Sequence, residues 1–502
     1  AVLVPWAFHT AWPSLRSRGL PAMSARGQMK AWSPSAGLQA LASPQALVAV
    51  VAGGAVLLSY LRRLRASLSL DRFTRVPGLP MLGVALQFAD PLKVSQRLAE
   101  WAREYGREGV FEFDLAGRRV VACCDWDVAK EVLALRPFKM IRSNVMMDTN
   151  LAFHGMFFVE GRQWSQQRRL VAPALSESAV QSYLPATCSV VETLLGQVEM
   201  SVQAGDPVNF SDMLRRYSAD LISKVAFGQD FGSLVHQSPD LDDLVAWFEA
   251  MESRMVAPVP YWKVPGVGKV VDGGDDVLAR LRSKVARLLD DASSSASATV
   301  LAKLAGAEGG KLTREEVIGN LITFFIAGTD TSSHTTSWAL YHLSQQPDLQ
   351  RRIAAEIESL QPGLATAGQV ATLSLTQAVW KETLRVHSVV PILGFENVED
   401  IALAGRTVPK GTELWVMTRE AARRAPAVQE VLGSDLDEWR PARWLAQDGS
   451  VKSVAPFDSL PFGHGARLCP GRRLADVSGP LVLAELLRRY EVQPWQGPAL
   501  VE

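Results

Sequence analysis

Apolar residues recur with two different periods along this chain. In residues 94–106 and 214–228 they return every three or four positions and each run closes on a glycine, which predicts two amphipathic helices. In residues 110–124 they alternate with polar residues on both sides of Ala116 and Gly117, which predicts a β-hairpin. Helical patterns outnumber alternating ones, so we expect a mainly α fold with small β-sheets, of the α+β class.

The longest helical pattern runs over residues 313–346. Thr313 and Glu316 have the spacing of a capping box, and Pro347 marks the end of the pattern. A proline inside a helix costs ~3 kcal/mol, so Pro480 predicts a kink or a break in the last helix, which begins near Gly471. The remaining patterns predict helices over residues 125–135, 347–360 and 373–387 and a second hairpin over 401–416.

The first 70 residues hold seven basic side chains and no acidic one, and residues 31–61 carry no charge. An uncharged run of this length spans a bilayer, and Arg62, Arg63 and Arg65 directly after it favour a cytoplasmic position for the rest of the chain. We therefore predict a leader or targeting segment over residues 1–39, a membrane anchor over 40–65 and one large domain over 75–502. A cleaved signal or a buried helix is the alternative to the anchor.

This topology predicts a protein of the endoplasmic reticulum membrane with its large domain in the cytoplasm. Residues 1–28 also match an organelle transit peptide, because they contain arginine and serine and lack acids. A plastid or a mitochondrion is therefore the alternative location.

Composition excludes several classes of protein. The 502 residues carry 52 basic and 52 acidic side chains, with no basic stripe of the kind that binds nucleic acid. Four cysteines in so long a chain do not build a disulfide framework and suit a reducing compartment.

Cys469 lies in a short loop, FGHGARLCPG, that contains three glycines and a proline. The glycines permit tight or left-handed turns. A single cysteine in such a loop is a structural thiol, a nucleophile or a metal ligand. The backbone N–H groups of the loop and the helix start that follows favour a thiolate, whereas the nearby base, His464, has no acid in this stretch to orient it.

The loop resembles the haem-binding loop of the cytochrome P-450 family, Phe-x-x-Gly-x-Arg-x-Cys-x-Gly. All five fixed positions are present: Phe462, Gly465, Arg467, Cys469 and Gly471. The resemblance implies the cytochrome P-450 fold, with a long central helix over haem and a proximal cysteine loop. It also implies that Cys469 is the axial thiolate ligand of the iron of haem b. A thiolate in this position favours cleavage of the O–O bond.

Two further motifs stand in the family's order along the chain. Trp164 and Arg168 are four residues apart on one helix face, and the resemblance implies that they contact a haem propionate. Glu382 and Arg385 match the motif Glu-x-x-Arg, and Arg443 is implied as the third member of a structural network. The alternative for the Glu–Arg pair is an ordinary surface ion pair, which contributes little to stability.

The segment AGTDTS, residues 327–332, places small and polar residues in the middle of the longest helix, where they disfavour helicity. It matches the family's oxygen-activation motif; the alternative is a helix–helix contact that needs small residues. The resemblance implies that Ala327 and Gly328 leave room for the cofactor and O2. It implies that Asp330 and Thr331 deliver protons.

One haem anchor of the family is missing from the sequence. The family often has an arginine about five residues before the aspartate of the following strand, and here Phe395 precedes Asp400 at that spacing. We expect Arg467 to carry more of the propionate contacts.

The resemblance implies a haem-thiolate monooxygenase that inserts one oxygen atom of O2 into a lipophilic substrate. Its electrons come from an NADPH-dependent reductase or a ferredoxin. The apolar stretches 150–161 and 321–328 also suggest a lipophilic ligand. Two alternatives are a haem-thiolate isomerase or dehydratase of hydroperoxides and a haem- or ligand-binding protein without turnover. Asp330 and Thr331 favour the monooxygenase, because the isomerases of the family often lack this pair.

Overall fold

The computed structural model describes residues 72–88, 91–257, 260–291, 299–306, 311–358, 366–454 and 461–495. The predicted leader (1–39) and anchor (40–65) lie outside these ranges, and within the ranges no helix is both long enough and apolar enough to cross a membrane. The helices are α3 (Pro91–Tyr105), α4 (Trp126–Ala134), α5 (Asn144–Met147), α6 (Gly161–Val171), α7 (Glu177–Ala204), α8 (Phe210–Ile222), α9 (Pro239–Val256), α10 (Val267–Val271), α11 (Gly274–Asp291), α12 (Val300–Ala305), α13 (Arg314–Ser344), α14 (Pro347–Glu358), α15 (Ala367–Thr372), α16 (Ser374–Val386), α17 (Thr418–Arg424), α18 (Pro426–Leu432) and α19 (Arg472–Arg489). The strands are β1 (Val110–Leu115), β2 (Arg118–Cys123), β3 (Met140–Arg142), β4 (Leu393–Asn397), β5 (Ile401–Leu403), β6 (Arg406–Val408) and β7 (Glu413–Val416).

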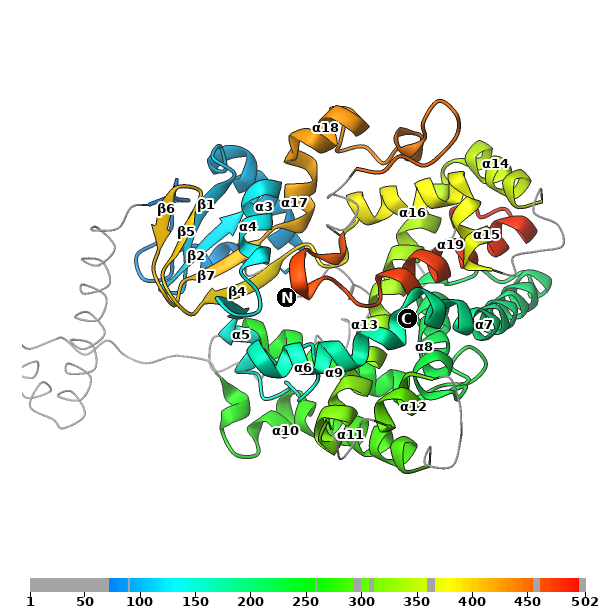
Figure 1. Cartoon of the computed structure of the whole chain (residues 1–502), viewed down its shortest axis with the longest axis horizontal. Helices are drawn as coiled ribbons and strands as arrows, with labels where there is room; N and C mark the ends of the chain where they lie inside the picture. The colour runs from blue at the N-terminus through cyan, green and yellow to red at the C-terminus, as the bar shows by residue number, and fades with distance from the viewer. Residues whose placement is uncertain are drawn as a thin grey trace, which may run out of the picture.

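The protein has a side that contains the sheets and a larger helical side (Figure 1). The main sheet has five strands in the order β1-β2-β7-β4-β3, and β5 and β6 form a separate two-stranded sheet. The helices α3, α4 and α17 lie beside the sheets, whereas α7, α8, α11 and α12 belong to the helical side (Figure 1). The predicted class, mainly α with small sheets, is confirmed.

The first predicted hairpin forms, and the second forms only in part. β1 and β2 pair antiparallel, and Ala116 and Gly117 between them have φ values of 50° and 79°. β5 and β6 make a hairpin, but β7 leaves it and pairs parallel with β2 in the main sheet. All four residues of β7 are buried, and at the centre of the sheet both of its edges are paired, with β2 on one side and β4 on the other.

The central helix of the helical side is α13 (Figure 1). It begins with the predicted capping box: the Glu316 N–H donates to Thr313 Oγ1 at 3.3 Å, and the Thr313 N–H donates to the Glu316 carboxylate at 2.9 Å. Residues 317–326 are all buried, and the apolar ones among them belong to the main core. There the Phe325 ring meets those of Phe227 and Phe231. These side chains therefore pack the core, and the lipophilic ligand expected from this stretch gains no support from them.

Of the kink or break predicted at Pro480, the break is wrong, because α19 runs through this residue from Arg472 to Arg489. The turn around this proline is buried against α16: a Cβ on Gly479 would lie 2.3 Å from the Trp380 ring. The Trp380 indole also donates to Asp476 at 3.0 Å. Packing against α16 offsets the hydrogen bond that the proline cannot make.

Two histidines join the last turn of α13 to the end of α16. The Nε2 atoms of His342 and His387 lie 2.7 Å apart. Trp338 stacks on His387 with 3.9 Å between ring centroids, and Trp439 stacks on His342 with 4.6 Å. Burial lowers the pKa of both imidazoles, and positive charge from His342 and neighbouring arginines helps to lower that of His387 to about 3.

Acid should therefore destabilise the fold through His387. Its folded pKa lies below the ordinary value of about 6.5, so the unfolded chain binds a proton that the folded protein does not. We expect the free energy of unfolding to fall as the pH drops from about 7.5 to about 5.5 in denaturant titrations. His387→Phe should reduce this slope, and His236→Asn, at an exposed histidine, should leave it unchanged. Equal slopes in His387→Phe and the unmodified protein would contradict the prediction.

Candidate functional site

The Cys469 loop is a tight turn held by its own backbone. The Cys469 N–H donates to the Phe462 carbonyl at 2.9 Å. Gly463 and Gly465 have φ values of 87° and 69°, a left-handed conformation that favours glycine. A Cβ on Gly465 would also stand 3.3 Å from the Leu133 carbonyl oxygen. Gly463 and Gly465 therefore have a backbone reason, whereas Gly471 has a φ of −77°, which any residue can adopt.

Cys469 is half-buried, two residues before Gly471, the N-cap of α19. Burial raises the pKa of its thiol, whereas the N–H groups of Gly471 and Arg472 and the charge of Arg168 lower it. Burial is the larger effect, so the pKa of the thiol lies above its ordinary value, and these groups only partly offset that rise. The His464 ring lies edge-on against Trp126 of α4, a packing role that weakens the nucleophile alternative.

Helix α6 contacts the loop through two of the predicted residues. Arg168 donates through Nη2 to the Leu468 carbonyl at 2.8 Å, a contact between residues 300 positions apart in the chain. One turn earlier Trp164 is buried, and the guanidinium group of Arg467 lies over its ring, 4.7 Å from the centroid. The structure thus brings Trp164, Arg168, Arg467 and Cys469 together.

Three buried arginines gather around one carboxylate beside this loop. Glu160 accepts hydrogen bonds from the side chains of Arg136 and Arg467 and, at 3.0 Å, from the backbone N–H of Arg142. Burial lowers the pKa of all three guanidinium groups, that of Arg467 to about 9. The like charge of Arg136 lowers the pKa of Arg142 and of Arg467 further. One acid for three cations leaves two positive charges of this cluster unbalanced.

The arginine cluster fits the predicted cofactor. The buried Nε atoms of Arg136 and Arg467 have no hydrogen-bond partner among the residues that the structure describes. Buried donors require an acceptor and excess positive charge favours an anion; a carboxylate provides both, because it forms charge-assisted hydrogen bonds with guanidinium groups. Haem has two propionates, which the guanidinium groups of this cluster would hold.

Phe395 lies inside this cluster. It pairs in register with Arg142 across β3 and β4, and the guanidinium group of Arg136 lies over its ring, 4.5 Å from the centroid. Arg142 on β3 and Arg136 in the turn before β3 therefore bring positive charge to Phe395, the position where the sequence lacks the expected arginine. Only Arg467 was expected to compensate for this arginine; Arg136 and Arg142 could not be predicted, because the β3–β4 pairing places them there.

On α13 the expected oxygen-activation residues lie around one exposed turn. Ala327 is exposed although residues 317–326 before it are buried, so α13 borders a water-accessible space there. Thr331 Oγ1 donates to the Ala327 carbonyl at 2.7 Å, which fixes the hydroxyl one turn further along. The Asp330 carboxylate lies beside the imidazole of His334, a residue that the sequence analysis did not select.

Gly328 lies against the end of α8. A Cβ on this residue would lie 2.4 Å from Ile222 Cδ1 of α8. This glycine therefore permits close packing of α13 against α8, as in the helix–helix alternative. Its expected role in leaving room for the cofactor stays a prediction, as does that of the exposed Ala327.

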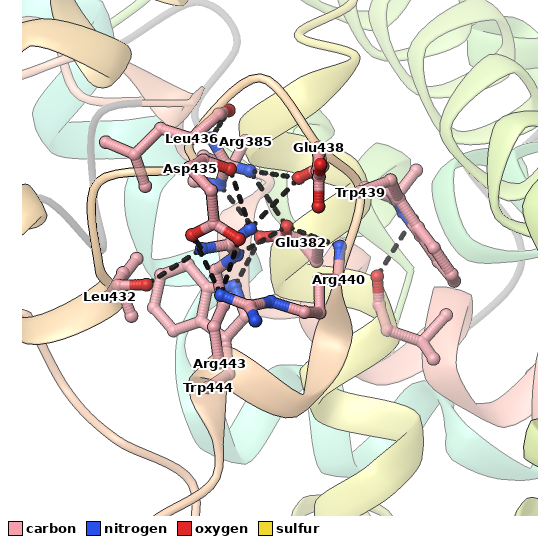
Figure 2. A network of polar contacts seen from close by, with 12 residues as sticks. Glu382, Arg385, Leu432, Asp435, Leu436, Glu438, Trp439, Arg440, Arg443 and Trp444 are labelled. Atoms are coloured by element: carbon pink, nitrogen blue, oxygen red, sulfur yellow. Dashed lines mark hydrogen bonds and ion pairs between the residues drawn. The ribbon is translucent and has the colours of Figure 1, made fainter.

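Glu382 forms the centre of a buried polar network (Figure 2). Its two carboxylate oxygens accept from Nε and Nη2 of Arg385, each at 2.8 Å, and one also accepts from Arg443 Nε at 2.9 Å. The Trp444 indole donates to the same carboxylate at 2.8 Å, and Asp435 accepts from Arg443 Nη1 at 2.8 Å. The structure joins the three predicted members and adds Trp444 and Asp435, which the motif spacing does not reveal.

Known proteins resemble this chain over most of its length. Residues 75–500 match the sequence profile of the family described as Cytochrome P450. The chain is 32% identical over 378 residues to "Sterol 26-hydroxylase, mitochondrial" of Oryctolagus cuniculus, which covers 68% of this chain and 67% of that protein. It is 32% identical over 377 residues to "25-hydroxyvitamin D-1 alpha hydroxylase, mitochondrial" of Homo sapiens, covering 69% and 72%. "Protein LUTEIN DEFICIENT 5, chloroplastic" of Arabidopsis thaliana is 22% identical over 408 residues, covering 77% and 67%.

Proposed function

This chain belongs to the cytochrome P450 family and is a haem-thiolate monooxygenase, and we propose that it hydroxylates a sterol-like lipid with electrons from a ferredoxin. Haem with an axial cysteine thiolate supplies the oxygen-activating chemistry of the family. The observation that carries our assignment of the site is the cluster of three buried arginines beside Cys469, with two positive charges unbalanced.

We assign each residue of the site a role that agrees with its contacts. Cys469 is the iron ligand, and its loop is shaped by Phe462, Gly465 and Gly471. The propionates are held by the charges of Arg136, Arg142 and Arg467, with Trp164 and Arg168 beside them. Glu382, Arg385 and Arg443 are structural: they tie α16 to the segment that ends in the short helix η6 (Pro441–Trp444).

The substrate proposal rests on the relatives. Two of them are named as hydroxylases of a sterol and of 25-hydroxyvitamin D, both of which are large, rigid and mostly apolar molecules. Binding of such a substrate is measured as a shift in the absorption of the ferric haem on titration with cholesterol or 25-hydroxyvitamin D3. Lauric acid is the comparison ligand. A shift with lauric acid and none with either steroid would contradict the sterol-like class.

Positive charge on the surface supports a ferredoxin as the electron donor. A surface hollow of about 520 Å³ is lined by Arg162, Arg169 and Lys311, and none of the described residues that line it is acidic. Arg169 follows Arg168, which contacts the Cys469 loop, so an acidic protein in this hollow would lie close to the haem site. Turnover with a ferredoxin and its reductase is the expected result. Turnover with a diflavin reductase alone would contradict the proposed donor.

We also propose an organelle as the location. Relatives named as mitochondrial and as chloroplastic support it, and none of the three supports the endoplasmic reticulum. Import of the full chain, fused to a fluorescent protein, tests the location. Fluorescence confined to the reticulum would contradict it.

Thr331→Ala should uncouple electron use from product formation. The Thr331 hydroxyl, which donates to the Ala327 carbonyl, can also accept and pass on a proton at the exposed turn. Without it we expect haem content and substrate affinity to remain and most electrons from NADPH to appear as hydrogen peroxide. Such acid–base assistance is worth ~10²–10⁴-fold in turnover. Product and peroxide per NADPH are the measurements.

Thr336→Ala is the matched control. The Thr336 hydroxyl also donates to the carbonyl four residues earlier, that of Ser332, at 3.0 Å, but its side chain is buried. In the Thr336→Ala enzyme, electron use should stay coupled to product formation. A fully coupled Thr331→Ala enzyme would overturn the role of Thr331.

A further inference from the structure

The indole of Trp247 on α9 has a buried N–H group with no acceptor. Its side chain is 1% exposed, and Nε1 has no hydrogen-bond partner among the residues that the structure describes. Buried donors in folded proteins are nearly always paired, because an unpaired one loses its hydrogen bonds to water and gains nothing in exchange. This N–H group therefore needs an acceptor from outside the chain.

Phenylalanine rings lie around this indole. The ring centroids of Phe153 and Phe158 lie 6.1 and 6.4 Å from that of Trp247. The ring centroid of Phe248 lies 5.2 Å away. A buried water is held by about three polar partners, and these rings offer none. A ligand that brings its own oxygen into an apolar site satisfies the N–H group without further partners.

The neighbours of Trp247 on α9 do not supply the acceptor either. Three residues that lie three or four positions away are buried and apolar: Leu244, Ala250 and Met251. Asp243, four residues before Trp247, accepts hydrogen bonds at both carboxylate oxygens from Arg280 of α11, each at 3.0 Å. This face of α9 therefore offers apolar side chains and one acid that is already paired.

Residues 153–158 reach from Trp247 to the arginine cluster. The Phe158 ring contacts Trp247 and also Phe157, whose ring centroid lies 4.9 Å away. The guanidinium group of Arg142 lies over the Phe157 ring, 3.9 Å from its centroid. One short segment thus contacts both the unpaired indole and the cluster that fits the haem propionates.

The same segment is fixed on α13. The Met156 N–H donates to Asn320 Oδ1 at 3.0 Å, and a Cβ on Gly155 would lie 2.3 Å from the Gly319 carbonyl oxygen. Asn320 and Ala327 are seven residues apart, so they lie on the same face of α13, about 10 Å apart along its axis. The segment that packs on Trp247 therefore borders the same face of α13 as the exposed turn at Ala327.

We propose that Trp247 is a specificity-determining residue whose indole N–H donates to a hydroxyl or carbonyl oxygen of the lipid substrate, remote from the carbon that is oxidised. The proposal rests on the monooxygenase function above. Only an elongated molecule reaches from Trp247 to the turn of Ala327, and sterol-like lipids are elongated. A lipid of the same shape without that oxygen leaves the N–H group unpaired in the complex, so the enzyme selects against it.

Cholesterol and cholest-5-ene differ only in one hydroxyl group, so they test the donor directly. We expect cholesterol to bind about 10-fold more tightly to the unmodified enzyme, as measured by the absorption of the ferric haem. Equal affinities for the two lipids would overturn the proposal.

Trp247→Phe removes the N–H group and keeps an aromatic ring among the phenylalanines. The preference for cholesterol should fall to less than about twofold in this variant, because cholesterol binds more weakly. Trp101→Phe is the matched control and should keep the preference, because Trp101 is also buried but belongs to the core beside the sheet. A full preference in Trp247→Phe would show that another group recognises the hydroxyl and would overturn the role of Trp247.

A resonance measurement follows the N–H group itself and needs no turnover. The reduced, CO-bound protein is diamagnetic, so ¹⁵N-labelled tryptophan reports each indole N–H. Loss of one signal in Trp247→Phe identifies that of Trp247 among the 14 tryptophans. We expect cholesterol to move this proton signal downfield, as a new hydrogen bond does, and cholest-5-ene not to do so.

A second pair of ligands, 1-dodecanol and dodecane, separates this proposal from the sterol-like class. A downfield shift with 1-dodecanol and none with cholesterol would support Trp247 as the donor and contradict the sterol-like class. A signal that neither alcohol moves would overturn the role of Trp247. Failure of the monooxygenase function appears differently, as the absence of a thiolate-type CO spectrum or of any product from the unmodified enzyme.

Discussion

Replacing Cys469 with histidine should move the absorption band of the reduced, CO-bound protein away from the thiolate position. The thiolate is the electron-rich axial ligand, and imidazole donates less charge to the iron. Cys469→Ala should remove the ligand altogether and leave haem absent or wrongly ligated. The surrounding loop is held by backbone contacts, such as that between the Cys469 N–H and the Phe462 carbonyl, so the substitutions should leave the fold intact. Absorption spectra and haem content are the measurements.

Cys188→Ser is the matched control for this experiment. Cys188 is also a half-buried cysteine, but it lies on α7. It should keep the thiolate-type spectrum. Unchanged spectra in both Cys469 variants would show that another group ligates the iron.

Arg385→Leu should yield little folded protein. The substitution leaves the Glu382 carboxylate buried without its bidentate partner, and losing one partner of a buried ion pair costs ~3–5 kcal/mol. Arg443 and Trp444 still contact that carboxylate, but they do not replace the two bonds at 2.8 Å. Soluble yield, haem content and the free energy of unfolding are the measurements.

Arg351→Leu shows what an exposed pair contributes. Arg351 and Asp348 lie three apart on α14, with 63% and 92% of their side chains exposed. Such pairs contribute ~0–1 kcal/mol, so this variant should fold normally. If both variants show the same small loss of stability, the Glu382 network is not the structural lock that we propose.

Local patterns were sufficient for the helices predicted over residues 94–106, 125–135, 214–228, 313–346, 347–360 and 373–387 and for the site motifs that lie within one short segment. The capping box of α13, the turn at Ala116 and Gly117 and the left-handed glycines of the Cys469 loop depend on neighbours in the chain, so residue types there predict conformation. The pair of Asp330 and His334 also has a local signal, the four-residue spacing, which the analysis of the sequence did not use.

Local patterns failed where distant segments compete for the same residues. β7 is predicted as part of a hairpin with β5 and β6, but it pairs with β2 because a fully buried strand needs neighbours on both sides. Pro480 predicts a break, but packing of its turn against Trp380 keeps α19 continuous.

The sequence by itself determined the family, the iron ligand that we propose and the members of the Glu382 network, because these depend on residue types at fixed spacings. Only the tertiary structure decided how the missing arginine at Phe395 is compensated. Arg136 and Arg142 reach that position through the pairing of β3 with β4, and Glu160 balances just one of the three buried charges there. Charge balance in a buried site is a sum over segments far apart in the chain, so no single stretch of sequence carries it.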